Sequence, residues 1–188
     1  AVPGGEGAMA AILGRGVADV EALAAEAAGG DVCQVANEND PMQTVISGSK
    51  AAVERAVGLA KEKGAKRALL LPVSAPFHCA LMEPAAEAMK AALSDVEINA
   101  PSVPVVANVA AEAVSDPDVI RDLLIKQVSG RVRWSASMAW MAEQGVDAFW
   151  ELGAGKALSG MIRRIAKDAE TRAVGTAEQV ADAAGAER

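Results

Sequence analysis

The sequence is poor in aromatic residues, in histidine and in cysteine, and these shortages limit what the chain can be. Aromatic residues make up 3% of the 188 residues, whereas hydrophobic residues, many of them alanine, make up 52%. A core built from alanine and aliphatic side chains favours closely packed helices over a β-sandwich. With one histidine and two separate cysteines, Cys33 and Cys79, the chain fits neither a disulfide framework nor a histidine–cysteine zinc site.

The chain also lacks an excess of positive charge and a long apolar run. Its formal net charge is −7, which argues against nucleic acid or an anionic membrane surface as a partner. No apolar segment reaches the ~18 residues of a membrane span. The start, AVPGGEGAMA, does not place a basic stretch before an apolar run, as a signal peptide does. We therefore expect a cytoplasmic protein without a membrane partner.

The N-terminal part of the chain, residues 1–74, has the pattern of a small subdomain. Strand-like and helical spacings follow one another in the order β-α-β-β-α-β. The predicted strands are 7–14, 31–39, 42–48 and 66–73, and the predicted helices are 18–27 and 49–64. This order is typical of a ferredoxin-like subdomain.

Residues 75–188 instead predict part of a parallel α/β sheet. The run VPVVANV, 103–109, is wholly apolar and is typical of a strand buried on both faces. Asp116 and Pro117 begin a helix, and AFWELGAGKALSGMIRRIAK contains a strand, a glycine turn and a helix. Because only two or three such strands are present, the predicted fold class is α/β. It combines a partial, α/β-hydrolase-like parallel sheet with the ferredoxin-like subdomain.

His78, the only histidine, lies in the loop PVSAPFHCALMEP after a predicted strand. A neutral imidazole suits general-base chemistry near neutral pH, and catalytic groups often follow the strands of an α/β sheet. The alternative is a loop histidine that merely satisfies a carbonyl. The position alone leaves both interpretations open.

Two further stretches have a functional and a structural interpretation. ELGAGKALSG, 151–160, is a glycine turn entering a helix, which either binds a phosphate or only turns the chain. Asn37, Asn39 and Gln43 offer amides that suit pantetheine-like or peptide-like ligands, although asparagine is also common in turns.

Basic residues form two clusters in this acidic chain. Each cluster either attracts an acidic partner or complements a helix dipole at a helix end. The first cluster is Lys61, Lys63, Lys66 and Arg67, and the second is Arg163, Arg164 and Lys167.

Four stretches together resemble one enzyme family. They are NENDPMQTVISG, GAKRALLLPVSAPFHCALM, NAPSVPVVANV and ELGAGKALSGMIRRI, in that order and spacing. In them the chain is similar to the malonyl-CoA:acyl carrier protein transacylases, and the similarity extends over nearly its whole length.

The resemblance implies a mechanism. In the family, a serine on a G-H-S-x-G elbow attacks malonyl-CoA while a histidine takes its proton. The malonyl group then passes to the phosphopantetheine thiol of acyl carrier protein. By this resemblance His78 is the general base, and the main-chain carbonyl of Gln127 orients its ring.

The resemblance also implies roles for other residues. Phe77 is expected to favour malonyl over methylmalonyl groups by excluding an α-methyl. Asn37 and Asn39 are expected to line the thioester entrance. Lys66 and Arg67 are candidates for docking acyl carrier protein. The family implies malonyl-CoA as a substrate, with no tightly bound cofactor and no metal.

The chain departs from the family pattern in one decisive respect. It contains no G-H-S-x-G elbow, and the oxyanion loop and the arginine for the malonyl carboxylate are also missing. We expect these to come from an upstream segment of the same enzyme, so that this chain alone is inactive. Two alternatives remain. One is a non-catalytic module that binds acyl carrier protein or CoA, and the other is the acyltransferase part of a polyketide synthase or malonate decarboxylase.

Overall fold

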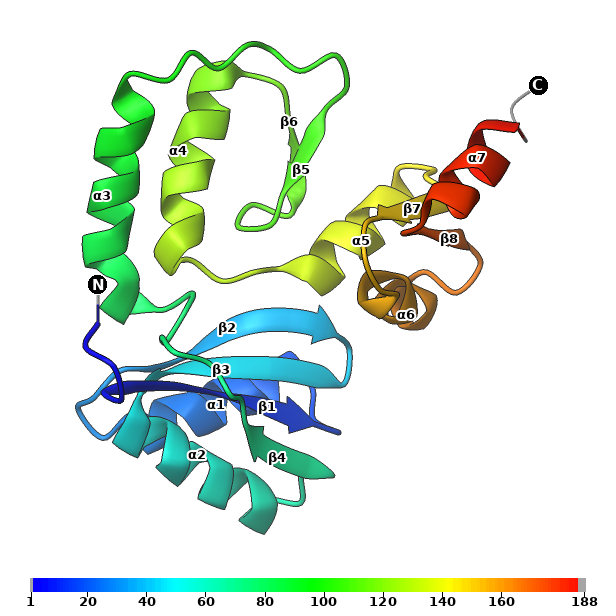
Figure 1. The fold of residues 1–188 in the computed structure, drawn as a ribbon. Coiled ribbons are helices and arrows are strands. Elements are labelled where there is room, and N and C mark those ends of the chain that lie inside the picture. Colours follow the sequence, from blue (N-terminus) through cyan, green and yellow to red (C-terminus); the bar gives the residue numbers. More distant parts are fainter. Residues whose placement is uncertain (1, 186–188) are drawn as a thin grey trace. The chain divides into compact units, whose positions relative to one another are not determined.

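The computed structural model describes residues 2–185, which form two compact units, one ending at Ser137 and the other beginning at Met138 (Figure 1). The first unit contains β1 Gly7–Leu13, α1 Val17–Ala28, β2 Cys33–Asp40, β3 Gln43–Ser49, α2 Lys50–Glu62, β4 Arg67–Leu70, a short 3₁₀ helix η1 Ala80–Met82, α3 Glu83–Ser94, β5 Val105–Ala107, β6 Glu112–Val114 and α4 Pro117–Ser129. Helix α5, Trp134–Glu143, crosses the boundary. The second unit continues with β7 Ala148–Leu152, α6 Ala157–Ile165, β8 Glu170–Val174 and α7 Ala177–Gly185.

The N-terminal part folds into an antiparallel sheet with the strand order β2-β3-β1-β4. Helices α1 and α2 pack on each other and cover one face of this sheet (Figure 1). Alternate strand residues such as Ala10, Ile12 and Ile46 point into the core between sheet and helices, as the two-residue period of a strand requires. The observed element order, β-α-β-β-α-β, is the predicted one.

Gly48 shows why this sheet needs a glycine on β3. A Cβ atom built there would lie 1.9 Å from the carbonyl oxygen of Val32, a contact that no side chain tolerates. The amide of Ser49 donates to the same Val32 oxygen at 2.9 Å. The close approach of the chain before β2 to β3 therefore depends on the missing side chain.

After the sheet, α3 packs on α4, while β5 pairs antiparallel with β6. The guanidinium of Arg121 on α4 donates to the carbonyl oxygens of Leu93 and Val96 and so ties the end of α3 to α4. Helix α4 begins with a capped turn, in which the Asp116 carboxylate accepts from the amides of residues 118 and 119 at 2.9 and 3.0 Å.

The prediction that 103–109 is a strand buried on both faces was wrong. Val103 is 69% exposed and Val105 is 43% exposed, and the strand covers only 105–107. Apolar composition shows that a segment is suited to burial, but it does not show that the same chain supplies the residues that bury it. In the described part of the chain β5 has β6 as its only strand neighbour, so one edge of the strand stays unpaired.

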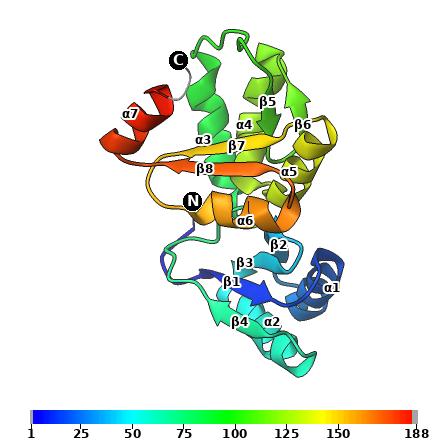
Figure 2. The ribbon, with the colours of Figure 1, turned by 90° about the vertical axis from the view of Figure 1, so that its right-hand side faces the viewer.

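In the second unit β7 and β8 pair in parallel, with α6 packed against both strands (Figure 2). The prediction of a strand, a glycine turn and a helix in this stretch is confirmed by β7, the turn at 153–156 and α6. Arg172 of β8 lies over the Trp150 ring of β7, 4.9 Å from its centre. Within residues 2–185, no helix has the length and apolar character that crossing a bilayer requires.

Candidate active site

His78 has a strained backbone held by a tightly packed loop. Its φ is 59°, in the left-handed region that residues other than glycine seldom adopt. Two residues earlier, Pro76 is fully buried, and a Cβ on Gly7 would come within 2.4 Å of its ring. The Cys79 thiol, also buried, donates to the Pro76 carbonyl at 3.2 Å. Such strain is retained where surrounding packing enforces it, often at functional sites.

The imidazole of His78 contacts the main chain of Gln127. Its Nδ1 lies 3.0 Å from the Gln127 carbonyl oxygen. Gln127 is in the last turn of α4, where carbonyls lack a partner within the helix and are free to accept. When Nδ1–H donates to this oxygen, Nε2 keeps its lone pair and is able to accept a proton.

Strand β2 anchors the segments that carry both groups. On the His78 side, the amide of Ala80 donates to the Gln34 side-chain oxygen at 2.8 Å. On the Gln127 side, Val132 forms a parallel bridge with β2. Its amide donates to the Ala36 carbonyl at 2.7 Å, and its carbonyl accepts from the Glu38 amide at 2.8 Å. Strand β2 thus contacts both the segment that carries the ring and the segment that carries the carbonyl.

Arg131, next to this bridge, forms ion pairs with two acidic residues from different elements. One guanidinium nitrogen donates to Glu38 of β2 at 2.9 Å, and the other donates to Glu21 of α1. The Glu38 side chain is only 14% exposed, so this half of the arrangement is sheltered from water. Burial works to lower the pKa of Arg131, but the hydrogen bonds and charges of the two carboxylates outweigh it and raise that pKa.

A cleft of about 400 Å³ opens beside these groups. His78, residues 129–131 and residues of α1 and β2 line it. Cys33 of β2 also faces the cleft. Burial raises the pKa of its thiol to about 11, against the opposing effect of Arg55 and with a smaller contribution from Cys79. The Cys33 thiol is therefore protonated at neutral pH and is a poor nucleophile.

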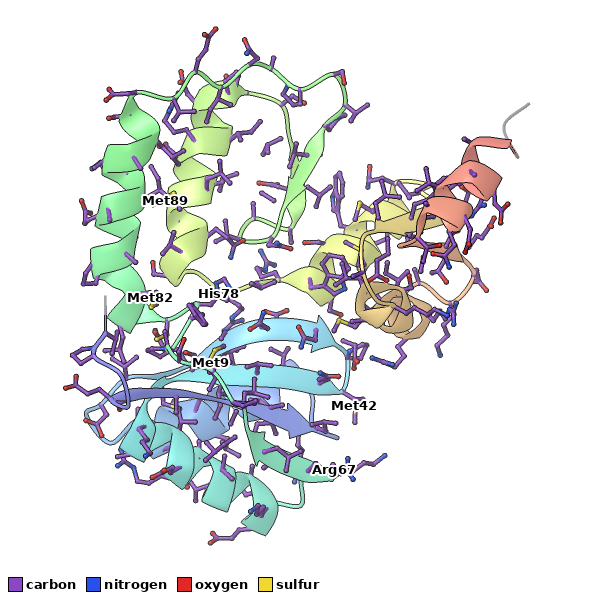
Figure 3. All side chains as sticks on the ribbon, viewed as in Figure 1. Met9, Met42, Arg67, His78, Met82 and Met89 are labelled. Carbon is purple, nitrogen blue, oxygen red and sulfur yellow. The ribbon has the colours of Figure 1, made fainter. Side chains whose placement is uncertain are left out.

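The other predicted site residues lie at varying distances from His78. Phe77, its neighbour in sequence, is 40% exposed. Asn37 and Asn39 are half-buried on β2, and Asn37 takes part in the bridge to Val132. Lys66 and Arg67 are exposed at the start of β4. Figure 3 shows Arg67 at the end of β4 remote from His78, so the structure does not bring the two together.

The glycine turn of the second unit is occupied by a side chain of the chain itself. The Glu151 carboxylate accepts from the amides of Leu158 and Ser159 at 3.1 and 2.8 Å and from the Ser159 hydroxyl at 2.7 Å. Hydrogen bonds from the Ser159 hydroxyl and then from its amide lower the pKa of Glu151, against an opposing effect of burial and with a further, smaller lowering by the Leu158 amide. These donors at the start of α6 are already used, which favours the structural interpretation over phosphate binding.

Sequence reasoning missed the residues that hold the site together. Arg131 is 93 residues from Glu38 and 110 from Glu21 along the chain. Gln34 is 46 residues from Ala80. No local pattern connects residues so far apart. Among residues 2–185, no group of three or more histidine, cysteine, aspartate or glutamate side chains is placed to hold a metal ion.

Comparison with known proteins identifies relatives along nearly the whole chain. The acyl transferase domain family matches residues 2–183. Malonyl CoA-acyl carrier protein transacylase of Escherichia coli K12 is 50% identical over 165 residues, which are 88% of this chain and 53% of the relative. The Bacillus subtilis protein of the same name is 45% identical over 184 residues, covering 96% and 57%.

Solved structures agree with these matches. The acyl-carrier-protein S-malonyltransferase of Bartonella henselae superposes with a TM-score of 0.94 and 51% identity over 98% of this chain and 59% of that one. A malonyl-transacylase in complex with a type II PKS acyl-carrier protein gives a TM-score of 0.89 at 40% identity, covering 95% and 58%. The α/β class and the resemblance predicted from the sequence are confirmed.

The chain spans little more than half the length of the curated relatives that it matches. The family match extends over residues 2–183, which include both the strained histidine loop and the glycine turn of the second unit. The chain belongs to the acyl transferase domain family.

Proposed function

We propose that this chain is part of an enzyme that transfers a malonyl group from malonyl-CoA to the phosphopantetheine thiol of acyl carrier protein in fatty-acid biosynthesis. The observation that carries the proposal is the contact between His78 Nδ1 and the Gln127 carbonyl at 3.0 Å. A carbonyl in that place selects the tautomer whose Nε2 accepts a proton. Similarity to proteins named malonyl transacylases supports the choice of acyl group.

In this proposal His78 serves both half-reactions. Its Nε2 takes the proton of a serine hydroxyl as the serine oxygen attacks the malonyl thioester, and the departing CoA sulfur receives that proton. The carrier thiol then gives its proton to the same nitrogen as it attacks the malonyl-serine ester. The serine recovers its proton when the ester bond breaks. The serine itself is proposed to come from a segment of the enzyme outside this chain, because the sequence contains no G-H-S-x-G.

The remaining predicted residues are consistent with this proposal, but the proposal does not depend on them. Phe77, beside the base, would exclude an α-methyl group, and Asn37 and Asn39 would contact the pantetheine arm. The exposed cations Lys66 and Arg67 would attract the acidic carrier protein at the far end of β4. Because they lie away from His78, they would act on docking rather than on chemistry. A cytoplasmic location stays a prediction.

We also infer a finer division of the fold. The order β2-β3-β1-β4 with two helices on one face supports a ferredoxin-like subdomain. The parallel pair β7 and β8 supports membership of the later strands in a larger, α/β-hydrolase-like sheet. Exposed apolar residues of β5 and α4, such as Val105 and Leu124, support an upstream segment of the enzyme as the partner that covers them. The boundary after residue 74 stays a prediction.

Complementation tests the proposed function. The chain is co-expressed with the serine-bearing upstream part of a transacylase of this family, and transfer of labelled malonyl from CoA to acyl carrier protein is measured. We expect transfer only when both polypeptides are present. A folded complex that transfers nothing would count against the proposal.

The absence of the serine motif from the sequence also supports a second, non-catalytic function. In it, the chain binds acyl carrier protein or CoA without catalysis. Titration of the chain with carrier protein, together with the complementation assay, separates the two functions. Salt-sensitive binding without transfer by any complex favours the binding module. A polyketide or malonate decarboxylase context is distinguished by which carrier protein accepts the label.

A further inference from the structure

The carbonyl that contacts His78 belongs to the last turn of α4, a helix that packs on α3 and contacts η1. None of the residues of α4 is buried in this chain, so packing alone does not fix its last turn. Helix ends also fray more readily than helix centres. Interactions of the segment after this turn are therefore well placed to help keep the Gln127 oxygen 3.0 Å from Nδ1.

The segment directly after α4 supplies that interaction. Gly130 leaves the helix with no room for a side chain, since a Cβ would lie 2.6 Å from the Lys126 carbonyl and 2.9 Å from Val109. Val132 then bridges to β2, and Arg131 reaches Glu38 of β2 and Glu21 of α1. Arg131 is the fourth residue after Gln127, so we expect a movement of Arg131 to disturb the carbonyl.

We propose that Arg131 is a positioning residue for His78, which acts by holding the Gln127 carbonyl on Nδ1 through its ion pairs with Glu38 and Glu21. The inference rests on the proposed function in which His78 is the base. The geometry favours a real contribution over an incidental surface pair. The arginine side chain is 29% exposed and Glu38 only 14%, and the two carboxylates come from two different elements.

The competing explanation is that the backbone bridge at Val132 is sufficient. Its two hydrogen bonds, at 2.7 and 2.8 Å, also join the segment to β2. In that case Arg131 would contribute to stability alone, and its loss would leave the ring of His78 unchanged. The tautomer of the ring separates the two explanations, because stability by itself does not move it.

The single histidine makes this measurement direct. In the chain labelled with ¹⁵N at histidine, long-range proton–nitrogen NMR spectra contain the signals of one ring. They are recorded at about pH 8.5, where imidazoles are ordinarily neutral. We expect the parent chain to carry its proton on Nδ1. In Arg131→Met the ratio of the two tautomers should shift toward Nε2–H by roughly 3- to 10-fold, which corresponds to one weakened hydrogen bond.

Two further variants and one control complete the test. Arg131→Lys keeps the charge but reaches one carboxylate at a time, and Glu38→Gln keeps the shape but removes the charge, so both should give intermediate shifts. Arg55→Met is the matched control. Arg55 also ties two elements together, through Asp31 and the carbonyls of residues 27 and 28, but it does not touch the segment after α4. Its removal should lower the melting temperature and leave the tautomer unchanged.

The outcomes distinguish this inference from the proposed function. If the parent carries Nδ1–H and Arg131→Met keeps the parent ratio while melting earlier, the positioning role is overturned and the base role stands. If the parent ring carries its proton on Nε2, both are overturned. If the ratio shifts as expected but the complemented enzyme transfers no malonyl, Arg131 positions the ring and only the proposed function fails.

Discussion

The sheet region, Gly7–Leu71, and the region after it, Ala80–Gly185, differ in what they do with their apolar residues. The sheet region closes its own core, in which Ile12, Ile46 and Val53 are completely buried. The later region leaves comparable residues in water, including Val103 at 69% and Leu152 at 74% exposure. The first region therefore holds most of what its core requires, although β4 leaves Leu69 and Leu70 exposed at 52% and 49%, whereas the second presents more apolar surface that its own residues do not cover.

The candidate site draws on both regions. His78 follows the sheet region, while its hydrogen-bond partner lies at the end of α4 in the later region. Several contacts of the segments that carry them go to β2, and Arg131 adds one to Glu21 of α1. Strand β2, which belongs to the well-packed sheet, thus helps to position α4, a helix with no buried residues.

The largest expected effect is in the sheet region, at Gly48. Gly48→Val would force a side chain against the Val32 carbonyl, 1.9 Å from the new Cβ, and should cost roughly 4 kcal/mol or more of unfolding free energy. Urea unfolding followed by circular dichroism measures it. Gly58→Ala on α2 is the matched control. A Cβ there meets nothing within 4 Å, so this change should stabilise the chain by about 0.5–1 kcal/mol. Equal effects at both glycines would contradict the structure.

Paired truncations compare the two regions directly. Ile46→Ala empties a fully buried position on β3 and should cost about 2–5 kcal/mol. Leu124→Ala on α4 removes a side chain that is 47% exposed and should cost less than about 0.5 kcal/mol in this chain. Denaturant titration of both variants checks the pair. A loss at Leu124 as large as that at Ile46 would show that the later region is covered after all.

A smaller, pH-dependent effect is expected at Glu151. Because its hydrogen bonds lower the pKa of the carboxyl, the stabilisation is present above the ordinary range of a glutamate and is lost as the pH falls through the lowered value. Glu151→Gln should therefore lower the stability of the second unit at pH 7 and nearly match the parent in strong acid. Tryptophan fluorescence follows this, since two of the three tryptophans, Trp140 and Trp150, lie in the second unit. A difference that persists unchanged to low pH would contradict the assigned cause.

The sequence was most informative where local patterns decide the structure. Alternating apolar residues and glycine stops predicted the four strands and two helices of the sheet region in their observed order. The run 103–109 misled, because its apolar character matched a buried strand although Val103 and Val105 are exposed in this chain. Hydropathy does not show which other segment of a protein packs against an apolar strand.

The candidate site was less accessible to such reasoning. His78 stood out as the lone histidine, but its pairing with the Gln127 carbonyl, 49 residues away, came from family resemblance rather than from spacing. Arg131 and Gln34 carried no signal at all, because their partners are brought close only by the fold. The role of Glu151 could not be predicted for a similar reason. A carboxylate before a glycine turn gives no sequence signal of the backbone amides from which it accepts hydrogen bonds.

The most direct test of the account is the rate of malonyl transfer by the complemented enzyme carrying changes at the two ends of one hydrogen bond. His78→Ala should reduce the rate by about 10²–10⁴-fold, the usual contribution of a positioned base. Gln127→Ala should reduce it little, because the main-chain oxygen that His78 contacts at 3.0 Å survives the substitution. A fully active His78→Ala enzyme, or a large loss in a correctly folded Gln127→Ala enzyme, would contradict the account.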